Sequence, residues 1–203
     1  MAARGASATA LKQVAQEARS CTLCPLYRNA TQTVFGEGPV GAALMMVGEQ
    51  PGDQEDLAGH PFVGPAGRVL DRALSEAGIE RREVYLTNAV KHFKNEPRGK
   101  KRLHKRPNRY EVEVCRVWLG KEIALVQPRL ILALGVTAAV TLAGRPVVLS
   151  RERGRLVTLA EGRRGMVTIH PSSILRVPDA AARRAAFASL IEDLKSAAKQ
   201  AVA

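Results

Sequence analysis

Residues 42–53 read AALMMVGEQPGD, a short apolar run that passes directly into a polar turn bounded by Gly48 and Gly52. A run of this length with turn residues behind it is typical of a buried β-strand. Three more runs of this kind lie at residues 84–90, 130–134 and 166–169. Helical patterns separate or follow them at residues 67–77, 110–126, 136–142 and 179–201. The alternation predicts a mostly parallel four-stranded sheet with helices on both faces, a three-layer α/β/α sandwich.

The composition is that of a globular protein. With 203 residues, 46% hydrophobic and 25% charged, the chain is long enough for one buried core. No internal repeat or long Pro/Gly/Ser linker divides it, so we expect a single domain over residues 1–203. The chain has no run of about 18 apolar residues, and its first residues lack the layout of a signal peptide. We therefore expect a soluble, cytoplasmic protein that does not enter a membrane.

The positive charge is concentrated in one segment. The chain carries 31 Lys plus Arg against 19 Asp plus Glu, a formal net charge of +12. Residues 91–109 contain nine of these basic residues and a single acid, Glu96. A basic loop with this local field attracts a polyanion such as a nucleic-acid backbone. The alternative is a solvated, mobile basic loop, and the charge alone does not distinguish the two.

Polar residues follow the predicted strands at one edge of the sheet. In open parallel sheets, ligands bind beyond the carboxyl ends of the strands. The turns there supply Glu49, Asn88 and His170, so an acid, an amide and a histidine are expected to converge on one pocket. Three candidates have a structural alternative. Asn88 can be a turn cap, His170 a satisfied buried residue, and Phe62, in the loop after the first strand, a core ring.

Four motifs in this order resemble those of the iron–sulfur uracil-DNA glycosylases, over residues 21–176. They read GEQPGDQED at residues 48–56, GHPFVGPAG at 59–67, TNAVK at 87–91 and HPS at 170–172. Gln50 and the sequence KKRLH at residues 100–104 further resemble the UdgX branch, whose members trap uracil-containing DNA covalently. That branch typically has KRRIH, so Lys101 and Leu103 differ. A lysine in place of arginine weakens a bidentate phosphate contact.

The resemblance implies a role for each pocket residue. Phe62 is expected to stack on the flipped uracil, and Asn88 to read its Watson–Crick edge with one donor and one acceptor. His170 is expected to stabilise the negative charge on uracil O2 as the base departs. Gln50 lies near the same base, and Asp53 is a weaker catalytic candidate. The phosphate contacts are expected from Lys100, Lys101, Arg102, Lys105, Arg106 and Ser172.

His104 is the candidate nucleophile. Cleavage of the glycosidic bond leaves an oxocarbenium-like sugar, and a neutral imidazole near C1′ would capture it in place of water. The surrounding basic residues are expected to disfavour protonation of His104. Glu49 can stabilise the charge that the ring acquires, and Gln50 can position the ring. The alternative is that His104 is one more residue that contacts phosphate.

The three cysteines are an odd number, which argues against a disulfide framework. Where the iron–sulfur glycosylases have Asn-x-Val-Lys-Cys, this chain places His92 at the cysteine position. The resemblance therefore implies a 4Fe–4S cluster held by Cys21, Cys24, His92 and Cys115, since histidine also ligates iron in Rieske centres. Zinc in a Cys3His site is the inorganic alternative, and three unrelated buried thiols are another.

These expectations define one function and two alternatives. The protein is expected to excise uracil from DNA and to form a covalent His104–C1′ adduct, acting once per molecule. The first alternative is a turnover glycosylase that releases uracil and a free abasic site. The second is a non-catalytic, metal-stabilised DNA-binding module.

Overall fold

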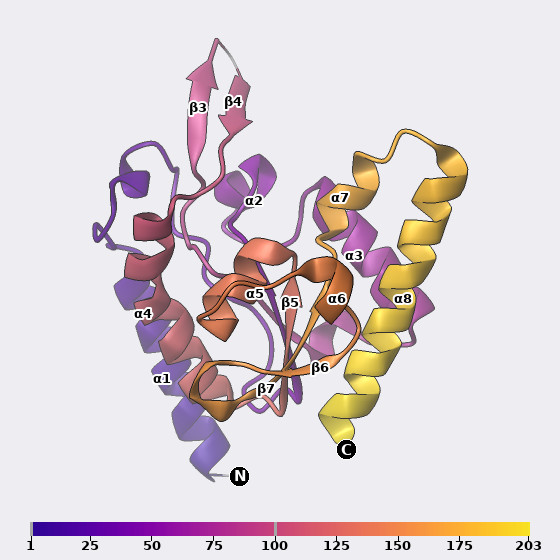
Figure 1. Cartoon of the computed structure of the whole chain (residues 1–203). Helices are drawn as coiled ribbons and strands as arrows, with labels where there is room; N and C mark the ends of the chain where they lie inside the picture. The colour runs from indigo at the N-terminus through magenta and orange to yellow at the C-terminus, as the bar shows by residue number, and fades with distance from the viewer. Residues whose placement is uncertain (1, 100) are drawn as a thin grey trace.

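The computed structural model describes residues 2–99 and 101–203, which form a three-layer α/β/α sandwich (Figure 1). Its central sheet has the strand order β2-β1-β5-β7-β6. The parallel strands are β1 (Leu44–Gly48), β2 (Tyr85–Asn88), β5 (Leu130–Leu134) and β7 (Arg164–Thr168). The predicted architecture is confirmed, with one strand more than expected. The fifth strand, β6 (Leu156–Thr158), is short, largely exposed and antiparallel to β7, so it lacks the apolar run of a buried strand.

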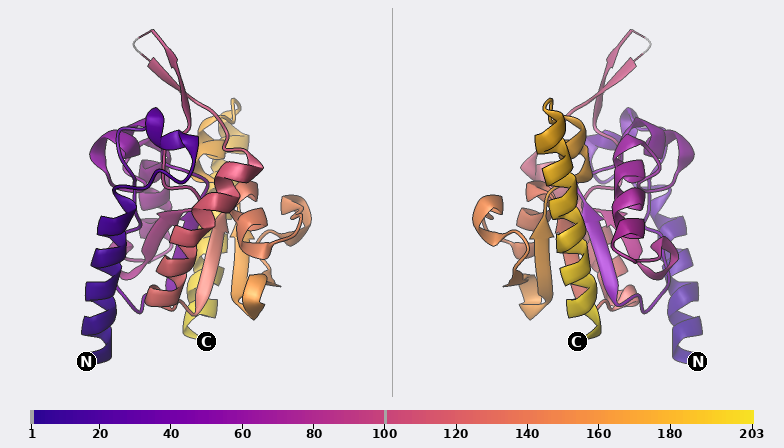
Figure 2. Two further views of the ribbon diagram at one scale, coloured as in Figure 1. Left: turned by 90° about the vertical axis from the view of Figure 1, so that its left-hand side faces the viewer. Right: turned by 90° about the vertical axis from the view of Figure 1, so that its right-hand side faces the viewer.

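Helices cover both faces of the sheet. Helices α3 (Pro65–Glu76), α7 (Pro171–Leu175) and α8 (Ala180–Val202) bury the face that carries Met46 and Leu132. Helices α4 (Arg109–Val126) and α5 (Val136–Ala143) bury the face that carries Met45 and Ile131. Helix α1 (Ala2–Ala18) packs beside α4, on the opposite side of the molecule from α8 (Figure 2). Within the described ranges, no helix combines the length and apolarity needed to cross a membrane.

Short elements complete the connections. They are α2 (Asp53–Ala58), α6 (Leu149–Glu152) and the 3₁₀ turns η1 (Pro25–Arg28), η2 (Arg81–Glu83) and η3 (Ala160–Gly162).

The strand order creates a switch point between β1 and β5. The chain leaves β1 toward β2, whereas it leaves β5 toward β7 on the other side of the sheet. The turns after β1 and β2 stay paired beyond the strands, since Ala89 N donates to Gly48 O at 2.9 Å and Val90 N to Glu49 O at 3.0 Å. The crevice in which doubly wound sheets bind their ligands therefore lies between the turns after β1 and β5.

The basic segment is not the loop that its sequence suggests. It forms an antiparallel hairpin, β3 (Asn95–Arg98) and β4 (Lys101–His104), which projects beyond the carboxyl ends of the sheet strands (Figure 1). Its first lysine, Lys91, is fully buried, with Nζ 2.5 Å from the buried carboxylate of Glu122. Lys100, one of the predicted phosphate contacts, lies outside the described residues.

Other cations of the segment pair with acids of the same molecule. Lys94 lies 2.8 Å from Glu111, and Lys105 lies 2.6 Å from Glu96 across the hairpin. Part of the predicted positive field is therefore neutralised internally. Arg98 and Lys101, which are exposed, lie opposite each other in the β3–β4 strand register beside the hairpin tip.

Candidate active site

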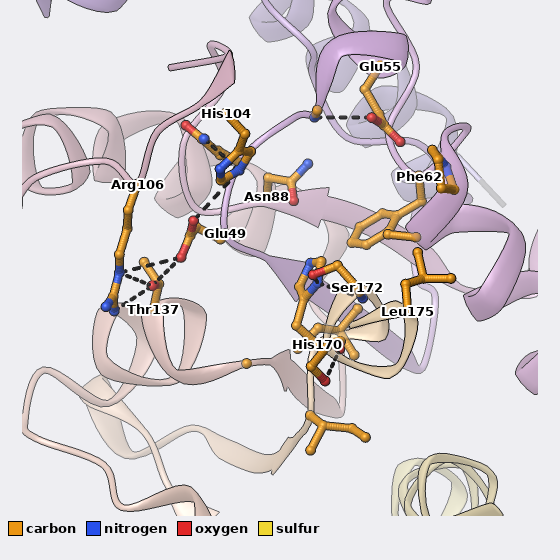
Figure 3. Close-up of a pocket in the computed structure, with 18 of the residues that line it drawn as sticks. Glu49, Glu55, Phe62, Asn88, His104, Arg106, Thr137, His170, Ser172 and Leu175 are labelled. Carbon is orange, nitrogen blue, oxygen red and sulfur yellow. Dashed lines mark hydrogen bonds and ion pairs between the residues drawn. The ribbon is translucent and has the colours of Figure 1, made fainter. Parts of the chain in front are cut away.

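A cavity of about 930 Å³ opens at the carboxyl edge of the sheet (Figure 3). The turns after β1, β2, β5 and β7, the start of α3 and the end of the hairpin all contribute to its walls. The predicted site residues that line it are Glu49, Gln50, Asp53, Phe62, Asn88, His104, Arg106, His170 and Ser172. Three predicted phosphate contacts, Lys101, Arg102 and Lys105, lie outside its lining. The structure thus brings most of the candidate residues together from five separate segments.

Phe62 and Asn88 meet over Gly48 at the end of β1. A Cβ at Gly48 would lie 2.3 Å from Asn88 Oδ1 and 2.7 Å from Phe62 Cζ, so only glycine leaves room for both side chains. Both residues are almost fully buried, yet both line the cavity. Among the described residues, none makes a hydrogen bond with the Asn88 carboxamide, so its donor and acceptor are available to a ligand.

His170 follows β7 and is the N-cap of α7. Its Nδ1 accepts a hydrogen bond from the backbone N–H of Ser172 at 3.1 Å and lies 2.8 Å from Ser172 Oγ. Because Nδ1 is an acceptor, the proton of the neutral ring is on Nε2. Burial, assisted by the positive charge of Arg176 and by His104, lowers the pKa of His170 to about 4. At neutral pH the ring is therefore an uncharged hydrogen-bond donor beside Phe62, with the two ring centroids 6.2 Å apart.

Gln50 joins His104 to both ends of the hairpin. Its Oε1 accepts from Lys94 N at 3.0 Å, and its Nε2 donates to Lys105 O at 2.8 Å. These two backbone partners fix which end of the carboxamide carries the hydrogens. The same Nε2 lies 2.8 Å from His104 Nε2, which must therefore be the unprotonated nitrogen.

The His104 ring is held neutral by its surroundings. Partial burial lowers the pKa of His104, Glu49 opposes this shift and Arg176 contributes to it. The cause therefore differs from the sequence-based expectation, in which the lysines and arginines of the hairpin disfavoured protonation. The result is a lone pair on Nε2 that faces the Gln50 amide at the cavity wall.

Glu49 lies between His104 and a threonine–arginine pair. Glu49 Oε1 is 4.0 Å from His104 Nε2, and Glu49 Oε2 accepts a hydrogen bond from Thr137 Oγ1. Arg106 donates to Thr137 Oγ1 from Nε at 3.1 Å and from Nη2 at 2.9 Å, and its Nε lies 3.7 Å from Glu49. The carboxylate is thus held where a positive charge on His104 would be stabilised. Thr137 lies in the helix predicted at residues 136–142, and the sequence indicated no role for it.

Asp53 and Arg102 are engaged with each other. Arg102 Nε donates to Asp53 at 2.7 Å, and Arg102 Nη1 donates to the buried Asp56 at 2.6 Å. The pair anchors β4 to α2, the helix that follows the first sheet-edge turn. In this structure, Arg102 therefore serves the hairpin rather than presenting a free guanidinium at the surface.

Glu55 shapes the loop that carries Phe62. This buried carboxylate accepts from Gly52 N at 3.1 Å and from Gly64 N at 2.7 Å. It thereby caps α2 and fixes the start of α3 with a single side chain. The sequence shows an acid in the right motif but not the second contact, because Gly64 lies in the next helix cap.

The three cysteines lie in one buried cluster between α1 and α4, together with Trp118. Trp118 Nε1 donates to Cys21 Sγ at 3.1 Å, and Lys91 N donates to Cys115 Sγ at 3.2 Å. Burial raises the pKa of Cys24, and it raises that of Cys115 to about 11.

His92, the next residue after Lys91, is buried, and no described residue makes a hydrogen bond with its Nδ1. Buried polar atoms are seldom left unpaired, so this nitrogen is chemically suited to be a ligand. Outside positions 1 and 100, no three His, Cys, Asp or Glu side chains form a group arranged to hold a single metal ion.

Comparisons with known proteins identify the chain's relatives. A family model described as the uracil DNA glycosylase superfamily matches residues 35–195. A type-4 uracil-DNA glycosylase of Thermotoga maritima is 35% identical over 185 residues, which cover 91% of each chain. Another, from Pyrobaculum aerophilum, is 36% identical over 83% of this chain and 86% of its own. A type-5 uracil-DNA glycosylase of the same organism is 30% identical over 75% of this chain and 74% of its own.

Proposed function

This chain belongs to the uracil-DNA glycosylase superfamily, and on that premise we propose that it excises uracil from DNA and captures the resulting sugar on His104. The proposal assigns the two activities to two walls of one cavity. The turns at the sheet edge bind and release the base, and the hairpin supplies the nucleophile.

Base recognition is assigned to Phe62, Asn88 and His170. The Phe62 ring offers a face on which uracil stacks. The unpaired Asn88 carboxamide can accept from uracil N3–H and donate to O4, which cytosine cannot match. As the C1′–N1 bond breaks, its electron pair moves onto the base, and the His170 Nε2–H donates to O2. A preorganised donor of this kind is worth about 10²–10³ in rate.

Capture is assigned to His104 Nε2. After the base leaves, C1′ carries oxocarbenium character, and the Nε2 lone pair forms a bond to it. The Gln50 Nε2–H must release that lone pair for the step to occur. The alkylated ring then holds a positive charge, which Glu49 stabilises until the Nδ1 proton passes to solvent. Because the new N–C bond has no good leaving group, the protein acts once, as proposed for a UdgX-like trap.

The observation that carries this proposal is the 2.8 Å contact between Gln50 Nε2 and His104 Nε2 at the cavity wall. The contact requires a neutral imidazole with its lone pair on Nε2, in a ring that lines the cavity. A histidine that only contacted phosphate would work better as a cation, which this arrangement disfavours.

The first test is intact-mass spectrometry after the protein is mixed with a short uracil-containing oligonucleotide, with peptide mapping of any adduct. An adduct on His104 supports the proposal. Released uracil with unmodified protein would instead make the chain a turnover glycosylase. If neither product forms, the chain is a DNA-binding module without base chemistry.

DNA contacts are assigned to the surfaces around the cavity mouth. Lys101 is exposed beside the hairpin tip, and Arg106 and Ser172 line the cavity. Lys105 and Arg102 already pair with carboxylates, so their contacts with phosphate would require those pairs to exchange. Lys100 completes the proposed set on sequence grounds.

We further propose that Cys21, Cys24, Cys115 and His92 hold a 4Fe–4S cluster. Support comes from the shared burial of the thiols, the N–H groups that donate to two sulfurs, and the unpaired His92 Nδ1. Bound by these residues, such a cluster would cross-link the N-terminal segment, the turn after β2 and α4. Iron, acid-labile sulfide and zinc analysis of the purified protein tests this. Zinc without iron would favour a Cys3His site, and neither metal would leave three buried thiols.

A further inference from the structure

Phe62 adopts a backbone conformation that few residues of its kind adopt. Its φ is 56°, in the left-handed region, where a bulky side chain other than Asn or Asp is uncommon. The conformation is also crowded from behind, because a Cβ at Gly67 would lie 1.9 Å from Phe62 O. A conformation of this type persists only where surrounding contacts impose it.

Arg81 is the side chain that grips this backbone. Its Nη2 donates to Pro61 O at 2.9 Å, and its Nη1 donates to Phe62 O at 3.3 Å. The same Nη1 also lies 2.5 Å from the carboxylate of Asp71 in α3, which further restrains the guanidinium. Two consecutive carbonyls are therefore held by one rigid fork, a geometry that a lysine ammonium cannot reproduce.

Arg81 contacts the carbonyls of Pro61 and Phe62 from outside the cavity. Arg81 belongs to η2, just before β2, and it does not line the cavity formed by the described residues. Its guanidinium reaches the carbonyls of the loop, whereas the Phe62 ring faces the cavity near His170 (Figure 3). Arg81 can therefore act on a ligand in the cavity only through the groups that it contacts, which are Pro61, Phe62 and Asp71.

We infer that Arg81 is a positioning residue for base binding, which holds the Phe62 ring in its stacking orientation by fixing the left-handed backbone at Phe62. This inference rests on the stacking role proposed for Phe62. Asp71 is part of the same device, since it orients the fork without touching the loop carbonyls itself.

A double-mutant cycle tests the inference on uracil release from a single-stranded oligonucleotide under single-turnover conditions. Arg81→Ala should lower the rate by about tenfold or more when Phe62 is present. In a Phe62→Ala background the same change should cost less than about twofold, because no ring remains to be displaced. Arg81→Lys should behave like Arg81→Ala. Equal losses in both backgrounds, or no loss in the parent, would overturn the inference.

Arg82→Ala is the matched control. Arg82 lies in the same 3₁₀ turn and is largely exposed, and its closest acid is Glu80 at 4.0 Å. It should therefore leave the rate unchanged within about twofold. A loss equal to that of Arg81→Ala would assign the effect to the turn as a whole and contradict the specific grip.

A second readout does not depend on activity. With 4-fluorophenylalanine at position 62, the ¹⁹F spectrum should show one sharp resonance in the parent and a shifted, broadened or doubled one in Arg81→Ala. An unchanged resonance would overturn the positioning claim. If the parent releases no uracil but its resonance depends on Arg81, the proposed function fails while the grip on Phe62 stands.

Discussion

The two walls of the cavity each carry a neutral histidine, and the two rings are prepared for opposite tasks. On the sheet-edge wall, the backbone N–H of Ser172 donates to His170 Nδ1 and leaves Nε2–H as a donor. On the hairpin wall, the Gln50 amide faces His104 Nε2 and leaves that nitrogen with a lone pair. Burial is the largest cause of the lowered pKa at both rings. Burial therefore sets the charge, and the hydrogen-bond partner decides which nitrogen acts and how.

The largest effect is expected from a change on the hairpin wall that removes the His104 ring. His104→Ser should reduce covalent adduct by more than about 10³-fold, because serine at this position has no base to activate it. Uracil release should continue. Denaturing gels with parallel uracil quantification measure both. His60→Ser is the matched control, since His60 is an exposed histidine paired with Glu37 outside the cavity. Undiminished adduct in His104→Ser would remove the nucleophile assignment.

The sheet-edge wall should respond differently. His170→Ala should slow uracil release by about 10²–10³-fold, the cost of losing one preorganised donor to a developing negative charge. Adduct should fall by the same factor, because capture follows base departure. Single-turnover rates of both products test this. A large loss of adduct with normal release would place His170 on the capture side instead.

Gln50→Glu should make His104 on the hairpin wall easier to protonate. A carboxylate cannot donate to His104 Nε2 or to Lys105 O, and its charge favours the protonated imidazole. The pKa of His104 should rise, and adduct formation near pH 7 should fall by about tenfold, with recovery at higher pH. Adduct yield across pH 6–9 measures this. A pH profile identical to that of the parent would mean that Gln50 does not control His104.

A further expected effect is on stability against pH rather than on chemistry. His170 has a folded pKa of about 4, below the ordinary 6.5, so the unfolded chain takes up its proton first. This contribution to stability is present above pH 6.5 and is lost as the pH falls toward 4, by at most about 1.4 kcal/mol per pH unit. The lowered pKa of His104 acts in the same direction. Urea unfolding between pH 7 and 4.5 should show a shallower loss in His170→Ala, and an unchanged slope would contradict the shift.

The regular part of the fold was predictable because burial on both faces of a sheet leaves apolar runs. Strand β5 has the predicted bounds, and α4 begins one residue before the prediction. Helix α1 was not predicted, since its alanine-rich sequence carries no strong periodicity, and it packs along α4.

The basic segment was predicted as a loop because charge patterns do not reveal partners. The burial of Lys91 depends on Glu122, 31 residues later in α4. Arg102 likewise depends on Asp53 and Asp56 in α2. Hairpin pairing here is supported by these distant acids rather than by alternating apolar residues.

The candidate site divides in the same way. The positions of residues at or just beyond the carboxyl end of a strand, such as Glu49, Asn88 and His170, were predicted from topology alone. Arg81 and Thr137 were not assigned roles, because they act through side chains and carbonyls from other segments. A sequence indicates which groups reach the sheet edge, and the contacts between segments determine how they are held.

The single carboxamide of Gln50 joins both legs of the hairpin at its base, through Lys94 N and Lys105 O. These two bonds hold the base of the hairpin, where His104 lies, independently of the outer part of the hairpin. Insertions, deletions or a grafted recognition sequence near the tip should be tolerated without displacing His104. If the proposed DNA contacts hold, the length and sequence of the hairpin near its tip can therefore be redesigned while Gln50 and His104 keep their positions.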